Sequence, residues 1–191
     1  MKLVSVHQMK ELETQADRNG LSYERMMANA GLETARVVHQ RYFRRQNHKI
    51  LGLIGSGNNG GDALVALAHL AAWGWRTQAY PVKEREKNDV LIDAYLKAGG
   101  KLLPAGERGD FPVLRDAIIE SDVLLDGVLG TGIKLPLKRE IEEVLAYILA
   151  IPDKPTVIAV DCPSGVDCDS GEAAPECLPA ELTICMAAVK Q

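Results

Sequence analysis

Apolar residues at the start of the chain recur every three to four positions, beginning with Val6, Met9, Leu12 and Ala16. This period predicts an amphipathic helix that ends at Asn19-Gly20. A second stretch with the same period predicts a helix that starts after Ser22 and continues toward Phe43. Gly31 lies inside this second helix, where glycine costs about 1 kcal/mol relative to alanine. We therefore expect a close backbone contact at Gly31.

From residue 49 the pattern changes to short aliphatic runs that alternate with helical spacing. The aliphatic runs predict strands over residues 50–54, 77–82, 101–103, 123–125, 157–160 and 182–184. Helical spacing falls between them, over residues 63–73, 89–98, 113–119 and 139–149. Continuous aliphatic strands are buried on both faces, and strand–helix repetition produces right-handed crossovers in a parallel sheet. The sequence thus predicts one α/β domain over residues 1–191, with three α/β/α layers, a mostly parallel sheet and two preceding helices.

Composition and charge narrow the functional class. The 191 residues are 47% hydrophobic and 25% charged, which is typical of one globular domain with a sizeable hydrophobic core. A net charge of −4 argues against a nucleic-acid binder, and we interpret the basic residues within 41–49 as a solvated helix end. No signal-peptide core develops, and no apolar run approaches the roughly 20 residues of a membrane span. We expect a cytoplasmic protein without a membrane partner.

The four cysteines lie in the last thirty residues: Cys162, Cys168, Cys177 and Cys185. They form no Cys-x-x-Cys pair and have no neighbouring histidines, which argues against a zinc site. With spacings of six to nine positions and a cytoplasmic setting, we expect free thiols, some of them buried as small hydrophobic side chains.

Three small, polar segments follow aliphatic strands. The first is the turn Gly55-Ser56-Gly57-Asn58-Asn59-Gly60-Gly61-Asp62, which leads into a helix pattern that begins near Asp62. The others are residues 126–134, headed by Asp126, and residues 161–167, headed by Asp161. A strand, a bare-backbone turn and a helix start are typical of a phosphate site. In a parallel sheet all three segments meet at the carboxyl edge, where ligands bind.

Each familiar motif taken alone fails in its context. Gly55-x-Gly57-x-x-Gly60 matches the dinucleotide fingerprint, but the next strand does not end in the acidic residue that a nicotinamide oxidoreductase needs. A P-loop would need Lys after Gly61, where Asp62 stands. A serine hydrolase would need a histidine beside Ser164, and no histidine falls on these loops.

Together, the three segments resemble one family. Asn58-Asn59-Gly60-Gly61-Asp62, the loop over 126–132 and Asp161-x-Pro163-Ser164-Gly165-Val166-Asp167 are similar to the NAD(P)HX epimerase family, also called the YjeF N-terminal domain. The early segment Met26-Met27-Ala28-Asn29-Ala30-Gly31 adds to the resemblance, which covers almost the whole chain. It implies a Rossmann-like α/β/α fold. It also implies an isomerase that interconverts the R and S forms of hydrated NADH and NADPH, a step in repair of these metabolites.

The resemblance also implies a set of site residues. The substrate's phosphates and ribose would contact Asn58, Asn59, Gly60, Gly61, Asp62, Gly130, Thr131, Gly132, Ile133, Lys134, Leu135 and Pro136. Asp161 would face the hydrated ring, and a potassium ion would be held by Asn59, Asp126 and Ser164. An amide, a carboxylate and a hydroxyl on three converging loops are oxygen ligands that suit a hard cation.

We choose Asp161 as the group that gives and takes the proton, because it follows the most aliphatic strand and precedes a proline-fixed turn. An alternative interpretation is that Asp62, Asp126 and Asp161 only cap helices. A second alternative is a non-catalytic nucleotide-binding scaffold, since one fold serves many functions.

The resemblance further implies partners and boundaries. The expected functional partner is an NAD(P)HX dehydratase, fused to this domain in some bacterial chains, and the expected assembly is a homodimer. The family's domain continues past the segment that residues 182–190 resemble, so we expect this chain to lack a final strand.

Overall fold

A computed structural model describes residues 3–43, 48–105 and 111–190, so part of the basic stretch at 41–49 lies outside the described residues. Six parallel strands form the main sheet in the order β4-β3-β2-β5-β6-β7. Their bounds are β2 (Lys49–Ile54), β3 (Arg76–Pro81), β4 (Lys101–Leu102), β5 (Val123–Gly127), β6 (Thr156–Val160) and β7 (Leu182–Ile184). Each strand lies within about two residues of its predicted range.

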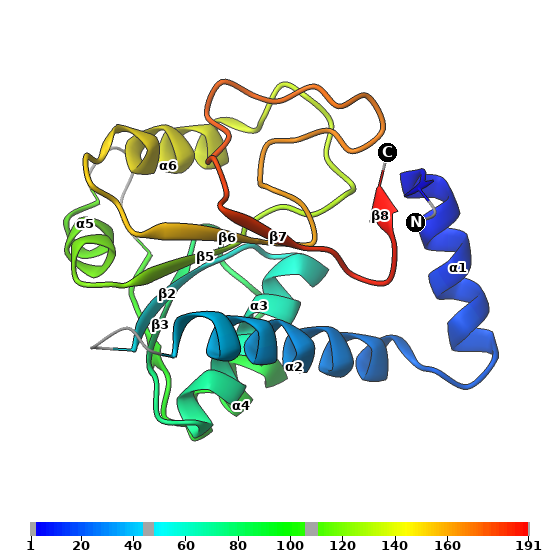
Figure 1. The fold of residues 1–191 in the computed structure, drawn as a ribbon, viewed down its shortest axis with the longest axis horizontal. Helices are drawn as coiled ribbons and strands as arrows, with labels where there is room; N and C mark the ends of the chain where they lie inside the picture. Colours follow the sequence, from blue (N-terminus) through cyan, green and yellow to red (C-terminus); the bar gives the residue numbers. More distant parts are fainter. Residues whose placement is uncertain (1–2, 44–47, 106–110, 191) are drawn as a thin grey trace.

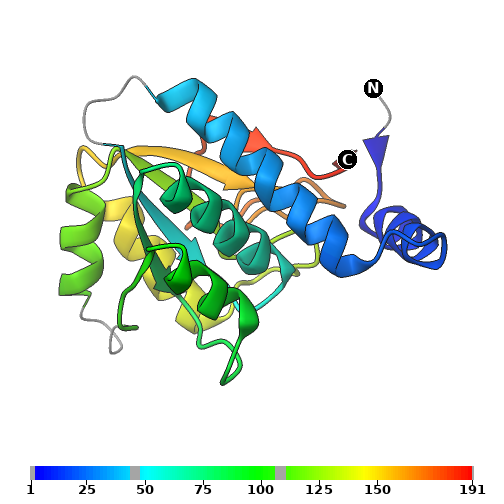
Figure 2. The ribbon, with the colours of Figure 1, turned by 90° about the horizontal axis from the view of Figure 1, so that it is seen from below.

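Helices cover both faces of this sheet (Figures 1 and 2). One face carries α2 (Tyr23–Tyr42), α3 (Asn58–Ala72) and α4 (Val90–Lys97), and the other carries α5 (Pro112–Ile119) and α6 (Arg139–Ala150). The predicted three-layer α/β/α fold is confirmed. In the described part of the chain, no helix is both long enough and apolar enough to cross a membrane.

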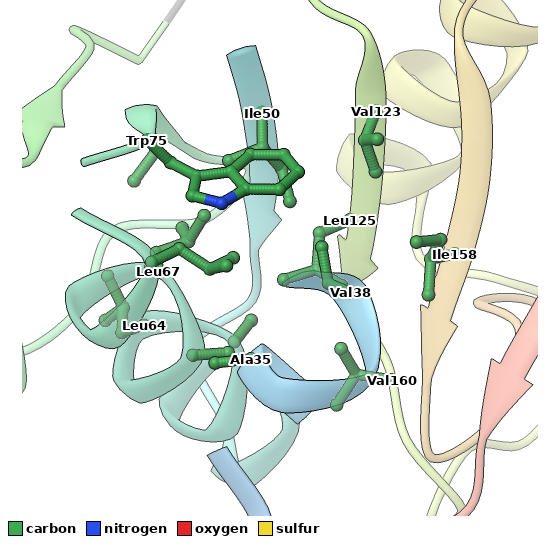
Figure 3. Close-up of a cluster of buried hydrophobic side chains, with 14 of the residues drawn as sticks. Ala35, Val38, Ile50, Leu64, Leu67, Trp75, Val123, Leu125, Ile158 and Val160 are labelled. Carbon is green, nitrogen blue, oxygen red and sulfur yellow. The ribbon is translucent and has the colours of Figure 1, made fainter. Parts of the chain in front are cut away.

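Side chains of the central strands alternate between two cores. Ile50 and Ile54 of β2 pack with α2 and α3, whereas Leu51 and Leu53 point into the layer under α5 and α6. Figure 3 shows the first core, in which side chains of three neighbouring strands, among them Ile50, Val123 and Ile158, lie in one cluster with Trp75. Burying each large aliphatic side chain stabilises the fold by about 1.5–3 kcal/mol. Because both faces are buried, the strands read as continuous aliphatic runs in the sequence.

A separate unit stands beyond the carboxyl ends of the strands. It consists of β1 (Leu3–Val4), α1 (Val6–Arg18) and β8 (Val189–Lys190), and β1 pairs with β8 in parallel (Figure 1). Ser5 and Gln8 form a capping box at the start of α1. The helix begins at Val6, the first residue of the predicted helical pattern. Two-residue strands carry no periodicity, so the sequence did not predict β1 or β8.

The close contact expected at Gly31 is confirmed. A Cβ there would lie 2.4 Å from Cγ1 of Val65 and 3.0 Å from the carbonyl oxygen of Asp62, both in α3. Val65 is β-branched and stiff, and the second neighbour is main chain, so neither can move away cheaply. Glycine at this position lets α2 pack directly on α3.

Replacing Gly31 with Ala should therefore lower the free energy of unfolding by about 1–3 kcal/mol, as overpacking does, despite alanine's better helix propensity. Calorimetry should find a fall in Tm of about 2–4 °C per kcal/mol. The matched control is Gly132→Ala, because a Cβ at Gly132 meets no described atom within 4 Å. An unchanged or raised Tm for Gly31→Ala would contradict the close packing.

Candidate functional site

The carboxyl ends of β2, β5 and β6 meet at one sheet edge. Asp126 pairs with Leu53 of β2 on one side and with Ala159 of β6 on the other. A cavity of about 430 Å³ opens there, between the strand ends and α1. The predicted site residues on its wall are Asn58, Asn59, Asp62, Gly130, Thr131, Gly132, Ile133 and Asp161. A volume of this size accommodates a small-molecule ligand.

The glycine-rich turn is shorter than the sequence suggested. Helix α3 begins at Asn58, with Gly57 as its N-cap, instead of near Asp62. The asparagines and glycines of the motif therefore form the first helical turn, whose N–H groups lack carbonyl partners within the helix. Since Gly57 and Asn58 line the cavity, the positive end of the α3 dipole faces it. Asp62 lies in the second turn of α3, so its interpretation as a cap is wrong.

Close packing explains why a glycine pair stands in this helix despite its low propensity. A Cβ on Gly60 would lie 2.0 Å from the carbonyl oxygen of Gly55. A Cβ on Gly61 would lie 2.8 Å from Cε of Met27 in α2. Neither glycine is on the cavity wall: Gly60 lets the turn fold back on the helix, and Gly61 leaves room for Met27 of α2. The low helix propensity of glycine is the reason that the predicted start of α3 lies too late in the sequence. In the folded protein these tertiary contacts outweigh that propensity.

A buried polar network ties the three loops together. Ser164 donates through Oγ to Oδ1 of Asp126 at 2.5 Å and through its backbone N–H to Oδ2 at 2.8 Å. The N–H of Leu129 donates to Oγ of Ser164 at 2.8 Å, and the side-chain amide of Asn59 donates to the Leu129 carbonyl at 2.8 Å. Both Asp126 and Ser164 are fully buried. The three residues predicted to hold potassium are thus brought together.

Within the described residues, this network leaves a buried carboxyl group without an ion pair and one amide oxygen without a hydrogen-bond partner. Burial raises the pKa of Asp126, and the hydrogen bonds from Ser164 act against that rise. Among the described residues, no basic side chain forms an ion pair with Asp126. The side-chain oxygen of Asn59 is buried and has no hydrogen-bond partner there. An orphaned amide oxygen in the same hydrogen-bond network as a buried carboxyl group fits a hard cation with oxygen ligands.

Among the described residues, no group of side chains comparable to this network offers nitrogen or sulfur ligands to a metal. The described residues contain no cluster of three or more histidine, cysteine, aspartate or glutamate side chains able to hold a metal. Among the described residues, no disulfide bond joins any of the four cysteines.

Asp161 lies on the cavity wall directly after β6, in a left-handed conformation with φ of 63°. Its N–H donates to the Ile184 carbonyl at 2.9 Å, and its Oδ1 accepts the N–H of Met186 at 3.0 Å. Left-handed backbone in a non-glycine residue is costly and persists only when its surroundings hold it. The end of β7 therefore fixes this carboxyl group. Neither Asp126, inside β5, nor Asp161 caps a helix, so that alternative is wrong for both.

The loop over residues 130–136 divides into two parts. Gly130, Thr131, Gly132 and Ile133 line the cavity, whereas Lys134, Leu135 and Pro136 do not. Lys134 is exposed, and its charge contributes to lowering the pKa of Asp167, after the N–H groups of Asp169 and Ser170. The Leu135–Pro136 peptide bond is cis.

Arg85 holds the glycine-rich turn from outside, and sequence reasoning missed it. One guanidinium nitrogen donates to the carbonyls of Gly55 at 2.7 Å and Gly57 at 3.1 Å, and Nε pairs with Asp89 at 2.6 Å. Burial pushes the pKa of Asp89 upward, but hydrogen bonds from Arg85 and the Leu91 N–H hold it below its usual value. Both charged side chains are about 10% exposed, so the pair is a structural clamp. No motif marks an arginine that binds carbonyls thirty residues away.

The cavity wall contains further residues that lie outside the three predicted segments: Met9, Lys10, Glu13, Lys83, Ile141 and Met186. Three of them belong to α1, so the first helix forms one side of the cavity. For Met9 the sequence predicts only a place on the apolar face of that helix. Lys83 pairs with Glu140 at 3.1 Å. Periodicity reports which face of a helix is apolar, but not which cavity it borders.

Comparisons with known proteins relate this chain to one family. The family described as YjeF-related protein N-terminus matches residues 23–191. A protein of Cenarchaeum symbiosum named NAD(P)H-hydrate epimerase is 32% identical over 98% of this chain and 86% of its own length. A protein of Methanopyrus kandleri named bifunctional NAD(P)H-hydrate repair enzyme Nnr is 30% identical over 95% of this chain, but over only 36% of its own length.

A solved structure supports the fold. The crystal structure of yeast ynu0, YNL200c, superposes with a TM-score of 0.88 and covers 100% of this chain and 82% of its own, at 20% identity. The family match covers most of the chain, and the Cenarchaeum relative covers nearly all of it. The resemblance drawn from the three loops is thereby confirmed, and the chain belongs to the family of YjeF-related protein N-termini.

Proposed function

We propose that this protein is an NAD(P)H-hydrate epimerase, which interconverts the R and S forms of NADHX and NADPHX at C6 of the nicotinamide ring. The observation that carries the proposal is the position of Asp161, held on the wall of the cavity that also receives the start of α3. The names of the Cenarchaeum and Methanopyrus relatives support the same activity. A pure scaffold would not need a carboxyl group fixed in a strained backbone conformation at this cavity.

The cavity offers separate places for the two ends of such a substrate. Pyrophosphate would lie against Gly57, Asn58 and the first turn of α3, where N–H groups and the helix dipole favour an anion. The loop at residues 130–133 closes the other side of this space. The hydrated ring would then face Asp161. The hydrogen bond from the N–H of Met186 to Oδ1 of Asp161 keeps this carboxyl group in one orientation on the cavity wall.

The proposed reaction needs one carboxyl group. The C6 hydroxyl is bonded to a carbon next to the ring nitrogen, so protonation by Asp161 lets it leave as water, while the nitrogen lone pair stabilises the cation. Water then adds to either face of C6, and the Asp161 carboxylate takes back one proton. Atoms and charge balance over the cycle, and a general acid–base group of this kind contributes about 10²–10⁴-fold.

We also propose that Asn59, Asp126 and Ser164 hold a potassium ion. The ion would supply positive charge that compensates the buried carboxylate and offsets the substrate's phosphates. The orphaned Asn59 oxygen and the unpaired burial of Asp126 support this ligand set. An NAD(P)HX dehydratase is the proposed functional partner, as the bifunctional Methanopyrus relative suggests. A cytoplasmic location and a homodimer remain predictions.

Replacing Asp161 with Asn should lower kcat by at least about 100-fold, because the amide can neither give nor take the proton. Tm should change little, since Asn tolerates a positive φ and keeps an acceptor for Met186. The assay incubates one NADHX epimer and follows the other by chromatography, with a no-enzyme control for spontaneous exchange. Asp167→Asn is the matched control, because Asp167 lies in the same loop but off the cavity wall. Full activity in Asp161→Asn would remove this residue from the mechanism.

Potassium should raise Tm when it replaces choline at constant ionic strength, because an ion that binds only the folded state stabilises it by mass action. Asp126→Asn should lose most of this potassium-dependent rise, whereas Asp167→Asn should keep it. In crystals grown from potassium salts, the ion should show oxygen contacts longer than the about 2.0–2.1 Å of magnesium. An equal rise in choline, or an undiminished rise in Asp126→Asn, would argue against the site.

Arg85→Met should raise KM by about tenfold and leave kcat within about twofold, because loss of a charge-assisted clamp frees the turn that receives the phosphates. Arg85→Lys should recover part of the loss, since one ammonium cannot reproduce both the forked contact and the pair with Asp89. Arg139→Met serves as the control, because Arg139 pairs with Glu143 on the surface, away from the cavity. Steady-state kinetics in which Arg85→Met matches Arg139→Met would exclude this positioning role.

A further inference from the structure

Two thiols meet in the loop that follows β6. The Sγ atoms of Cys162 and Cys168 lie 2.7 Å apart, and both residues are buried, with exposed fractions of 6% and 3%. A disulfide bond is about 2.05 Å long, so the two sulfur atoms need to approach by less than an ångström to form one. The sequence predicts only that some of the four cysteines are buried as small hydrophobic side chains, and the proposed epimerase reaction uses neither Cys162 nor Cys168.

The backbone between the two cysteines already holds them in this arrangement. The N–H of Val166 donates to the Pro163 carbonyl at 3.1 Å, and that of Ala174 donates to the Gly165 carbonyl at 2.8 Å. Val166 and Ala173 form an antiparallel bridge, and both thiols approach the carbonyl of Val166, at 3.8 and 3.9 Å. The loop is thus folded before any bond forms between the sulfur atoms.

The pair brackets residues of the site. Cys162 directly follows Asp161, and Ser164, which binds Asp126, lies between the two cysteines. Val6, the first residue of α1, packs over both thiols, and its N–H donates to Oδ1 of Asp169 at 2.9 Å. A bond between the sulfur atoms would therefore fix the loop that contains Asp161 and Ser164. It would also fix the surface against which the first residue of α1, Val6, packs.

We propose that Cys162 and Cys168 form a reversible disulfide that locks this loop in the conformation it already has. With hydrogen peroxide as the oxidant, one sulfur attacks the O–O bond and becomes a sulfenic acid, and the first oxygen leaves as water. The second sulfur attacks the sulfenic sulfur and expels the hydroxyl as a second water. Two thiols and one peroxide thus give one disulfide and two waters, and a dithiol reductant reverses the change.

The test oxidises the purified protein with hydrogen peroxide and blocks the remaining thiols with an alkylating reagent. A protease that cuts before aspartate separates Cys162 from Cys168, because Asp167 lies between them. Mass spectrometry should then find the two peptides joined and two hydrogen atoms lighter. Tm should rise by about 5 °C, as expected for closing a short loop in the unfolded chain, and should return to its starting value with dithiothreitol.

Two double variants serve as a matched pair. Cys177→Ala with Cys185→Ala should keep the linked peptides and the rise in Tm, whereas Cys162→Ala with Cys168→Ala should lose both. Links to Cys177 or Cys185, sulfinic acid in place of a disulfide, or a fall in Tm on oxidation would each overturn the proposal. These readouts do not depend on catalysis. The further expectation that the oxidised protein keeps its epimerase activity rests on the proposed function and fails separately from the bond itself.

Discussion

The site depends on one buried carboxyl group. Asp126 is fully buried in the central strand β5, and both of its oxygens accept hydrogen bonds from Ser164. The bonds from Leu129 and Asn59 extend this contact to the other two loops. Because burying an unpaired charge is expensive, the carboxyl group takes up a proton, is satisfied by hydrogen bonds from these loops, or binds a cation. Loop positions at this edge of the sheet are set by that requirement.

The site also requires that segments of main chain pack closely against each other around the start of α3. Gly60 lets the turn fold back to within contact of Gly55, while Gly31 brings α2 onto α3. Arg85 then holds the turn by donating hydrogen bonds to the carbonyls of Gly55 and Gly57. A helix start fixed by these contacts presents its N–H groups to the cavity in one orientation. Such preorganisation reduces what must be ordered when an anion binds.

Two aspartates that look equivalent in the sequence have different surroundings. Each stands at the end of an aliphatic strand and before a polar loop, yet Asp126 is sealed in a network and Asp161 borders the cavity. The difference arises because Asp126 lies inside β5, between two paired strands, whereas Asp161 turns away after β6 in a left-handed conformation. One carboxyl group thus suits a fixed ion and the other a reacting ligand.

The sequence by itself determined the layers of the fold and the strand positions, because buried strands read as aliphatic runs and helix faces repeat every three to four residues. It determined the family through the motifs of the three loops. It also brought Asn59, Asp126 and Ser164 together correctly. It placed the start of α3 four residues late and missed Arg85, the side of the cavity formed by α1, and the contact between Cys162 and Cys168. Only the tertiary structure decided these features. Each depends on contacts between segments far apart in the sequence or on the path of a loop, and such contacts and paths leave no periodic pattern along the chain.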